Sequence, residues 1–301
     1  MRRVLVTGAS GFIGRHVVRA LLDASWDVVA LVRDRSVPAE IQGARTERGD
    51  VTDTASYRSL LKDCGAVCHL AAYVPAAAGP DTLEECMRVN AAATGRLAFE
   101  AAAVPGMRFV FFGAGNVYAP SGRPATEDAP VYPRGPAAAY LVSKLAGEML
   151  VEQIRETRGL HAVSLRIASP YGPGMRQGSS ATTFMERAAR GETLVVKDGG
   201  RHAADLIWVG DVGVVSLRAL EGTAQGVFNI GSGTRTSTAD LARAVVATYP
   251  ETGAKIETEP PGAAPASGYP AVDITKARRV WGFSPHTLAE GLAAYRTWLA
   301  R

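Results

Sequence analysis

The sequence predicts an α/β fold in which helices cover both faces of a doubly wound parallel sheet. Two observations carry this prediction: short apolar runs rich in β-branched residues alternate with Ala- and Leu-rich segments over residues 1–168, and such runs are typical of parallel strands buried on both faces. The 301 residues allow one large domain or two smaller ones. Hydrophobic residues make up 47% and charged residues 21%, which excludes a disordered or fibrous chain.

The elements follow in order along the chain. Strands are expected at 4–7, 27–32, 44–48, 66–70, 108–112 and 161–167, with helices at 14–24, 53–61, 81–103 and 137–157. After Ile167 the alternation ends. Strands are expected there at 194–196, 206–209 and 227–230, and helices at 182–190, 211–220, 238–249, 275–281 and 287–299. Residues 250–270 are rich in Pro, Gly and Ala and are expected to form a surface loop.

Charge and cysteine content exclude several classes of protein. The net charge of +4 comes from 33 basic and 29 acidic residues without a basic stripe, so no nucleic-acid partner is expected. Three cysteines without zinc-finger spacing indicate buried thiols in a reducing compartment and no metal site. No apolar stretch approaches the roughly 18 residues that span a membrane. We therefore expect a cytoplasmic protein with no membrane partner.

A glycine-rich loop joins the first predicted strand to the first helix. Gly8 would make the tight turn, Gly11 would let the backbone approach a pyrophosphate, and Gly14 would let the helix pack closely on the sheet. The helix N-terminus then faces the phosphates. A glycine-rich turn without a ligand is the alternative, which the strand–loop–helix context disfavours. The loop residues assigned to a dinucleotide are Gly8, Ser10, Gly11, Phe12, Ile13 and Gly14.

The end of the second strand predicts which dinucleotide is bound. NAD sites place an acid about 20 residues after the glycine loop. Here the expected position is Val32, followed by Arg33, and a guanidinium suits a 2′-phosphate. In the alternative interpretation Arg33 and Arg35 are solvated and Asp34 bonds the ribose. We predict NADP as the cofactor, with NAD as the alternative.

Tyr140 and Lys144 form a candidate catalytic pair. Their i, i+4 spacing places both on one face of a helix. A free phenol has a pKa near 10 and is a poor acid or base at neutral pH. A nearby ammonium stabilises the phenolate and lowers the pKa, so Tyr140 could give or take a proton. Lys144 could also bond the nicotinamide ribose. A solvated surface pair is the alternative.

Together these residues resemble the extended short-chain dehydrogenase/reductase superfamily and, within it, the NAD-dependent epimerase/dehydratase family. The resemblance covers almost the whole chain. Gly49-Asp50-Val51 matches the adenine-binding segment, His69-Leu70-Ala71-Ala72 the fourth-strand motif, and Val89-Asn90 the helix Asn that steadies the active site. Further cofactor contacts are thereby expected at Asp50, Val51, Leu70, Ala71, Ala72, Asn90 and Ser169. Candidate substrate contacts are Tyr73, Asn116, Tyr140, Arg176, Arg201 and His202.

The resemblance also implies a division of the chain. Residues 1–168 and about 203–234 would form the Rossmann domain, with the strands near 206–209 and 227–230 returning to the main sheet. Residues of about 169–202 and 235–301 would form a smaller substrate-binding α/β portion. By the same analogy, the helices near 81–103 and 137–157 would build a homodimer interface.

Departures from the family pattern bear on the chemistry. The family carries a Ser or Thr four residues before the Tyr of a Val-Tyr pair, where Ala114 stands here. A water, Asn116 or a substrate hydroxyl would have to substitute. The Asp-Glu pair with which the family's dehydratases eliminate water is also replaced, so elimination is disfavoured. Ala204 stands where nucleotide-sugar enzymes often have an Arg for the diphosphate, and Arg201 or His202 would compensate.

These observations predict an NAD(P)-dependent oxidoreductase. It would transfer hydride at a secondary alcohol or ketone of a sugar or sugar-like small molecule, with Tyr140 supplying or accepting the hydroxyl proton. One alternative is a nucleotide-sugar epimerase with tightly bound NAD. A second alternative, motivated by Ala114, is a dinucleotide-sensing binding protein with impaired catalysis.

Overall fold

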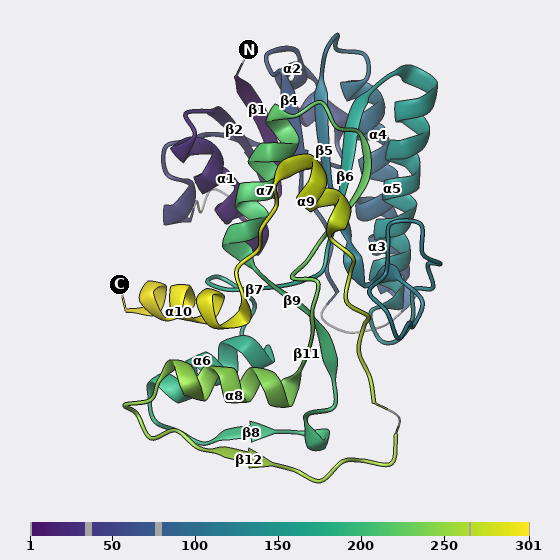
Figure 1. Ribbon diagram of the computed structural model, residues 1–301. Helices are drawn as coiled ribbons and strands as arrows, with labels where there is room; N and C mark the ends of the chain where they lie inside the picture. The colour runs from purple at the N-terminus through teal and green to yellow at the C-terminus, as the bar shows by residue number, and fades with distance from the viewer. Residues whose placement is uncertain (1, 34–37, 76–79, 265, 301) are drawn as a thin grey trace.

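The computed structural model describes residues 2–33, 38–75, 80–264 and 266–300 (Figure 1). Its centre is a parallel seven-stranded sheet in the order β10-β6-β5-β4-β1-β2-β3, so the predicted doubly wound fold is confirmed. The strands are β1 (Arg3–Thr7), β2 (Asp27–Val32), β3 (Arg45–Arg48), β4 (Ala66–His69), β5 (Arg108–Ala114), β6 (His161–Ile167) and β10 (Gly226–Ile230).

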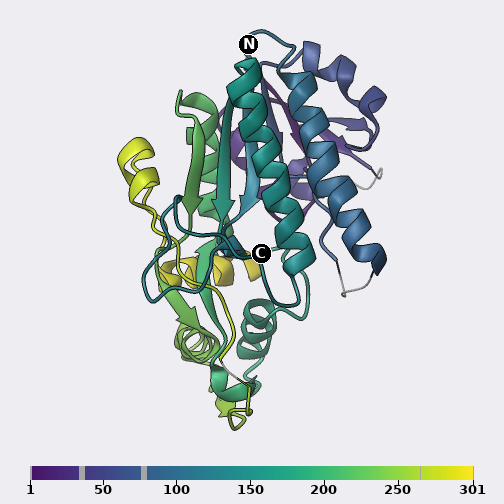
Figure 2. The same ribbon diagram turned by 90° about the vertical axis from the view of Figure 1, so that its right-hand side faces the viewer.

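Helices cover both faces of this sheet because its strands are apolar on both sides. In β1, Val4 and Val6 belong to one core cluster and Leu5 to another, since successive strand residues point to opposite faces. On one face lie α1 (Phe12–Asp23), α7 (Val209–Glu221) and α9 (Thr275–Trp281). On the other lie α2 (Arg58–Lys62), α4 (Ala93–Ala101) and α5 (Ala138–Arg158), with α4 and α5 side by side (Figure 2).

The helix predicted over 81–103 is interrupted. It consists of α3 (Pro80–Cys86), a π-helical segment η3 (Met87–Ala92) and α4. A π-helical turn inserts an extra residue and changes where the side chains point, and such turns are frequent at functional sites. Here Gly147 of α5 packs against the backbone carbonyl of Asn90 so closely that a Cβ atom would collide with it. The close approach of α5 therefore requires glycine at this position.

The second half of the chain departs from two predictions. The strand predicted at 206–209 does not return to the main sheet: β9 (Ala203–Trp208) pairs with β7 (Ser169–Tyr171) and β11 (Arg235–Ser237) in a separate three-stranded sheet. The strand predicted at 227–230 does return, as β10 beside β6. The expected loop at 250–270 contains β12 (Ile256–Thr258), which pairs with β8 (Leu194–Val196). The proposed division into two portions stays a prediction.

The remaining helices close a third core in the lower part of Figure 1. They are α6 (Ser180–Ala189), α8 (Thr238–Thr248) and α10 (Leu288–Leu299). No helix within the described ranges is long and apolar enough to cross a membrane. All three cysteines are buried and unpaired.

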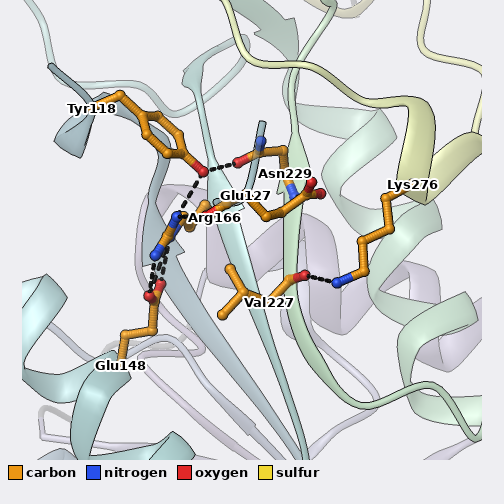
Figure 3. Close-up of polar contacts among 7 residues, drawn as sticks. All are labelled: Tyr118, Glu127, Glu148, Arg166, Val227, Asn229 and Lys276. Carbon is orange, nitrogen blue, oxygen red and sulfur yellow. Dashed lines mark hydrogen bonds and ion pairs between the residues drawn. The ribbon is translucent and has the colours of Figure 1, made fainter. Parts of the chain in front are cut away.

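A buried ion pair fixes α5 to the sheet (Figure 3). Arg166 of β6 donates from Nη2 to Oε1 of Glu148 on α5 at 2.7 Å and from Nε to Oε2 at 3.0 Å. Both residues are almost fully buried, with 7% and 4% of their surface exposed. Arg166 Nη1 also donates to the Tyr118 hydroxyl, which donates to Asn229 Oδ1 of β10 at 2.6 Å. This network holds α5, β6 and β10 in one register.

Lys276 joins helix α9 to the edge strand β10. Lys276 of α9 donates from Nζ to the Val227 carbonyl at 2.6 Å (Figure 3). Its Nζ also lies 4.3 Å from the centre of the Phe228 ring. Both contacts join α9 to β10, and the cation–π geometry adds to the hydrogen bond. The C-terminal part of the chain is thereby anchored on the main sheet.

Removing the cation of the buried pair should destabilise the fold. Arg166→Met leaves the Glu148 carboxylate buried without its partner, which commonly costs about 3–5 kcal/mol of unfolding free energy. Urea denaturation followed by circular dichroism would measure this loss. The double variant Arg166→Met/Glu148→Leu should recover most of it. Arg190→Met breaks the exposed pair with Glu192 and serves as the control. An Arg166→Met variant as stable as this control would contradict the assignment.

Candidate active site

The glycine loop forms the turn between β1 and α1. Gly8 has a φ of +69°, and a Cβ there would lie 2.6 Å from the amide nitrogen of Ala71. At Gly14 a Cβ would collide with the Gly8 carbonyl. Gly11 is the N-cap of α1, and because glycine has no side chain to cap the helix, the first backbone N–H groups are left to face a ligand. The tight turn at Gly8 and the close backbone approach at Gly14 are present in the structure, and the role of the loop toward a pyrophosphate stays a prediction.

A cavity of about 620 Å³ extends from this loop along the carboxyl ends of the parallel strands. Its size is that of a small-molecule site, and its position is where doubly wound folds bind ligands. The predicted residues that line it are Gly8, Ser10, Gly11, Phe12, Ile13, Gly14, Arg33, Asp50, Val51, Leu70, Ala71, Ala72, Tyr73, Tyr140 and Lys144. The sequence therefore identified both ends of one continuous cavity.

Several predicted contacts lie elsewhere in the described chain. Arg201 pairs with Asp198 at 2.6 Å and donates to the carbonyls of Gly262 and Ala264. It holds a loop in place rather than lining the cavity. His202 Nδ1 lies 2.9 Å from Ser267 Oγ. Neither these two residues nor Arg176, which is exposed, line the cavity described above, and their roles toward a substrate stay predictions.

Asn116 and Ser169, also predicted contacts, meet each other. Asn116 Nδ2 donates to Ser169 Oγ at 3.1 Å, just beyond the carboxyl ends of β5 and β6. Neither is part of the cavity lining described. Ala114 ends β5 one residue after Gly113, which does line the cavity. That Asn116 replaces the hydroxyl that Ala114 lacks stays a prediction.

Ten further lining residues were not among the predicted contacts, although Val32, Gly49 and Val89 stand in the motifs that predicted the site. They are Leu31, Val32, Gly49, Val74, Glu85, Arg88, Val89, Phe112, Gly113 and Ile167. Leu31, Phe112 and Ile167 stand at or near the carboxyl ends of predicted strands, so the sheet topology was the signal that would have found them. Glu85 and Arg88 come from the α3–η3 segment, for which no local pattern predicts a place in the cavity. Asp34 and Arg35, the alternative ribose contacts, lie outside the described residues.

Lys144 and Tyr140 face the cavity from α5. Lys144 is 2% exposed, its Nζ lies 4.4 Å from the centre of the Phe111 ring, and no described residue forms a hydrogen bond or ion pair with it. Burial lowers the pKa of Lys144 to about 7, with the charge of Glu148 opposing the shift. Burial, followed by the neighbouring Cys86, raises the pKa of Tyr140 to about 12.

The Tyr140 pKa differs in direction from the expectation that Lys144 would lower it. The reason is that both groups are buried, and desolvation penalises the charged form of each. Tyr140 is therefore a protonated phenol at neutral pH, able to donate a proton to an oxygen placed in the cavity. A buried amine with no partner among the described residues is itself a sign that the cavity accommodates a polar ligand.

A buried hydrogen-bonded path crosses beneath the cavity. Thr94 Oγ1 donates to the Asn90 carbonyl at 2.8 Å, so His69 Nε2 is the donor to Thr94 and His69 Nδ1 is the acceptor from Thr7. Burial, and then Lys144, lowers the pKa of His69 to about 3. The imidazole is thus neutral and has a single tautomer, fixed by its two threonine partners. It ties β1 and β4 to the η3–α4 helix.

Asn90 continues this path to the catalytic helix. Its Oδ1 accepts from the Tyr73 amide at 2.7 Å, and its Nδ2 donates to the Tyr73 carbonyl and to Ser143 Oγ, each at 2.9 Å. Ser143 Oγ donates to the Tyr140 carbonyl at 2.7 Å. Asn90 is fully buried and does not line the described cavity. Its contacts position Tyr73 and Tyr140, as the resemblance implied for the helix Asn.

These features fit a dinucleotide. The glycine loop leaves room that any Cβ would fill, Arg33 and Asp50 stand at the strand ends where a nucleoside binds, and Lys144 offers a buried ammonium at the far end. The chain would hold a pyrophosphate on the loop, an adenosine beside Asp50 and a nicotinamide near Tyr140.

Comparisons with known proteins agree with this geometry. Residues 4–231 match the model of the NAD dependent epimerase/dehydratase family. A UDP-glucose 4-epimerase of Mycolicibacterium smegmatis is 34% identical over 311 residues, which cover 97% of this chain and 96% of that protein. The match to the family model confirms the resemblance inferred from the motifs.

Two solved structures share the fold over nearly their whole length. The UDP-glucose 4-epimerase of Thermotoga maritima, with UDP-glucose, superposes with a TM-score of 0.84 at 25% identity and covers 99% of this chain and 98% of its own. MoeE5 in complex with UDP-glucuronic acid and NAD gives 0.84 at 30% identity, with 99% of each chain covered.

Replacing the buried Lys144 should stabilise the protein in the absence of nucleotide. Between about pH 7 and the ordinary pKa of 10.5, the folded chain binds fewer protons at this site than the unfolded chain, so stability rises with pH. Lys144→Met removes this penalty. The variant should exceed the wild type in Tm most at neutral pH and less toward pH 10.5. Lys62→Met, at an exposed position, is the control. A Lys144→Met protein that melts earlier at neutral pH would contradict this account.

Proposed function

The chain belongs to the NAD-dependent epimerase/dehydratase family, and from that membership we propose that it is an NAD(P)-dependent oxidoreductase acting on a secondary alcohol or ketone of a sugar or sugar-like metabolite. The observation that carries the proposal is a single cavity with a phosphate-binding loop at one end and a buried Tyr/Lys pair at the other. A nicotinamide bound there would supply the hydride chemistry. The chain's own residues bind, orient and exchange the proton.

Tyr140 is the proton-transfer residue in this proposal. Its phenol is held protonated by burial, which suits donation to a carbonyl oxygen and therefore the reductive direction. Lys144 stands one helical turn away with a buried ammonium and no described partner. Ribose hydroxyls beside it would supply the missing hydrogen bonds, and its charge would then favour the phenolate that remains after the proton leaves. Of the predicted substrate contacts, Tyr73 and Tyr140 line the cavity.

We propose NADP as the preferred nucleotide. Val32 occupies the position of the ribose-binding acid, and the exposed Arg33 that follows it lines the cavity. Within the described residues Arg33 makes no ion pair, so its guanidinium is available to a 2′-phosphate. NAD remains the alternative, because the solved relative MoeE5 was found with NAD.

The second candidate function is nucleotide-sugar epimerisation. The 34% identity to a UDP-glucose 4-epimerase favours it. An epimerase would keep its nucleotide through purification, whereas a reductase would exchange it with solution. A third candidate, a dinucleotide sensor, rests on Ala114 and would bind nucleotide without turnover. The cytoplasmic location stays a prediction.

Tyr140→Phe tests the proposed chemistry. It removes the hydroxyl proton but keeps the ring, so kcat should fall by about 10²–10⁴-fold in an NADPH-dependent ketone reduction assay. Nucleotide binding, measured by the fluorescence of NADPH, should change little because the ring does not hold the phosphates. An unchanged kcat would show that Tyr140 is not the proton donor and would favour the sensor hypothesis.

We further propose a homodimer built on the outer face of α4 and α5. Apolar side chains are exposed there, with 45% of Phe99 and 64% of Met149 accessible. Gly95, Phe99 and Leu150 line a shallow hollow between the two helices. A second copy of the chain would bury this face.

A negative charge introduced on the α4–α5 face should convert the proposed dimer into a monomer. Met149→Glu places a carboxylate at the centre of the proposed interface, and sedimentation velocity should show the mass of one chain instead of two. Val214→Glu alters an equally exposed apolar residue on α7, with 55% exposure, and should leave the dimer intact. A wild-type protein that sediments as a monomer would overturn the proposal.

A further inference from the structure

Glu85 and Arg88 bring a second ion pair to the cavity from the helical side. Arg88 donates from Nε to Glu85 Oε2 at 2.8 Å and from Nη2 to Oε1 at 2.7 Å. Both side chains line the cavity, and 51% of the Arg88 side chain and 35% of the Glu85 side chain are exposed. One edge of the guanidinium, Nε and Nη2, is thus engaged by one carboxylate, and arginine can hold a phosphate in the same two-bonded way.

Four charges converge at this end of the cavity. Burial opposes ionisation of Asp50, but hydrogen bonds from Thr52 and the charges of Arg33 and Arg88 outweigh it and lower the pKa of Asp50. The hydrogen bond from Arg88 lowers the pKa of Glu85, burial opposes it, and the charge of Arg33 adds to the lowering. Arg33, from the end of β2, lines the same cavity as Glu85 and Asp50.

Only one of the two arginines has an ion-pair partner among the described residues. Arg88 is held by Glu85, whereas Arg33 has no ion-pair partner among the residues described. An anion between them would complete both guanidinium groups. Oδ1 of Asp50 accepts from the amide and the hydroxyl of Thr52, at 2.8 Å each. The carboxylate that forms an ion pair with Arg88 is that of Glu85, so it is Glu85 that would compete with an incoming anion.

We propose that Arg33 and Arg88 together bind the 2′-phosphate of NADP, and that Glu85 competes with this phosphate for Arg88 and so sets the preference between NADP and NAD. The inference rests on the proposed nucleotide-binding function and adds Arg88 and Glu85 to it.

The chemistry of the two nucleotides explains the competition. A 2′-phosphate brings a charge of about −1.5 to −2 and three acceptor oxygens, enough to engage Arg33 and to draw Arg88 away from Glu85. A neutral 2′-hydroxyl carries no charge that could compete with Glu85 for Arg88, so the Arg88–Glu85 ion pair stays intact. Glu85 can instead accept a hydrogen bond from that hydroxyl, the task of the acid that Val32 replaces. The same pair of residues thereby responds differently to each nucleotide.

Equilibrium binding of NADPH and NADH to the full chain, followed by nucleotide fluorescence, tests this arrangement without any turnover. In Arg88→Gln the Kd for NADPH should rise by about tenfold while the Kd for NADH changes by less than about twofold. In Glu85→Gln the Kd for NADPH should fall by about threefold because the competing carboxylate is gone. Arg190→Gln, in an exposed pair outside the cavity, should alter neither.

The outcomes separate this inference from the proposed function. If the wild type binds both nucleotides and Arg88→Gln weakens them equally or not at all, Arg88 is not a phosphate ligand and the inference is overturned while the function stands. If Glu85→Gln weakens NADPH, Glu85 is not a competitor, and the inference is likewise overturned. If the wild type binds neither nucleotide, both fail. The gain of affinity expected for Glu85→Gln cannot arise from misfolding, so it guards against a variant that is merely unstable.

Discussion

The geometry of the active site depends on one side-chain amide. Asn90 holds the backbone of Tyr73 on both its amide and its carbonyl and reaches Tyr140 through Ser143. Its own carbonyl accepts from Thr94, whose hydroxyl continues through His69 toward β1. The side chains of Asn90, Ser143, Thr94 and His69 along this path are buried and have partners, so none can turn without leaving a buried polar atom unsatisfied. Strand β1 and helix α5 are therefore positioned as one unit.

Most of the fold could be predicted because the signals are local. The runs at 27–32 and 161–167 match β2 and β6 residue for residue, since continuous apolar stretches bounded by polar turns have few other interpretations. The placement of β9 was wrong because its neighbour is chosen by tertiary contacts, which periodicity does not contain. The strand at 256–258 was missed because all three of its residues are exposed, and it exists only through pairing with β8.

The site could be predicted where a motif requires a particular backbone conformation or helix face. Gly8 and Gly14 indicate a close approach of two backbone segments, and the i, i+4 spacing of Tyr140 and Lys144 indicates a shared helix face. What could not be predicted depends on burial. The raised pKa of Tyr140 reflects desolvation by residues distant in sequence. Arg88 lines the cavity from a π-helical segment that begins at Met87, and no apolar pattern indicates such a segment.

The close contact between Gly147 and the Asn90 carbonyl bears on how the protein loses its activity on heating. Helix α5 cannot slide or roll at this point without a backbone collision, and the Arg166–Glu148 pair holds the same helix a few ångströms away. We therefore expect helix α5 to unfold together with the central sheet and not as a separate segment. Thermal loss of activity should then coincide with global unfolding of the protein.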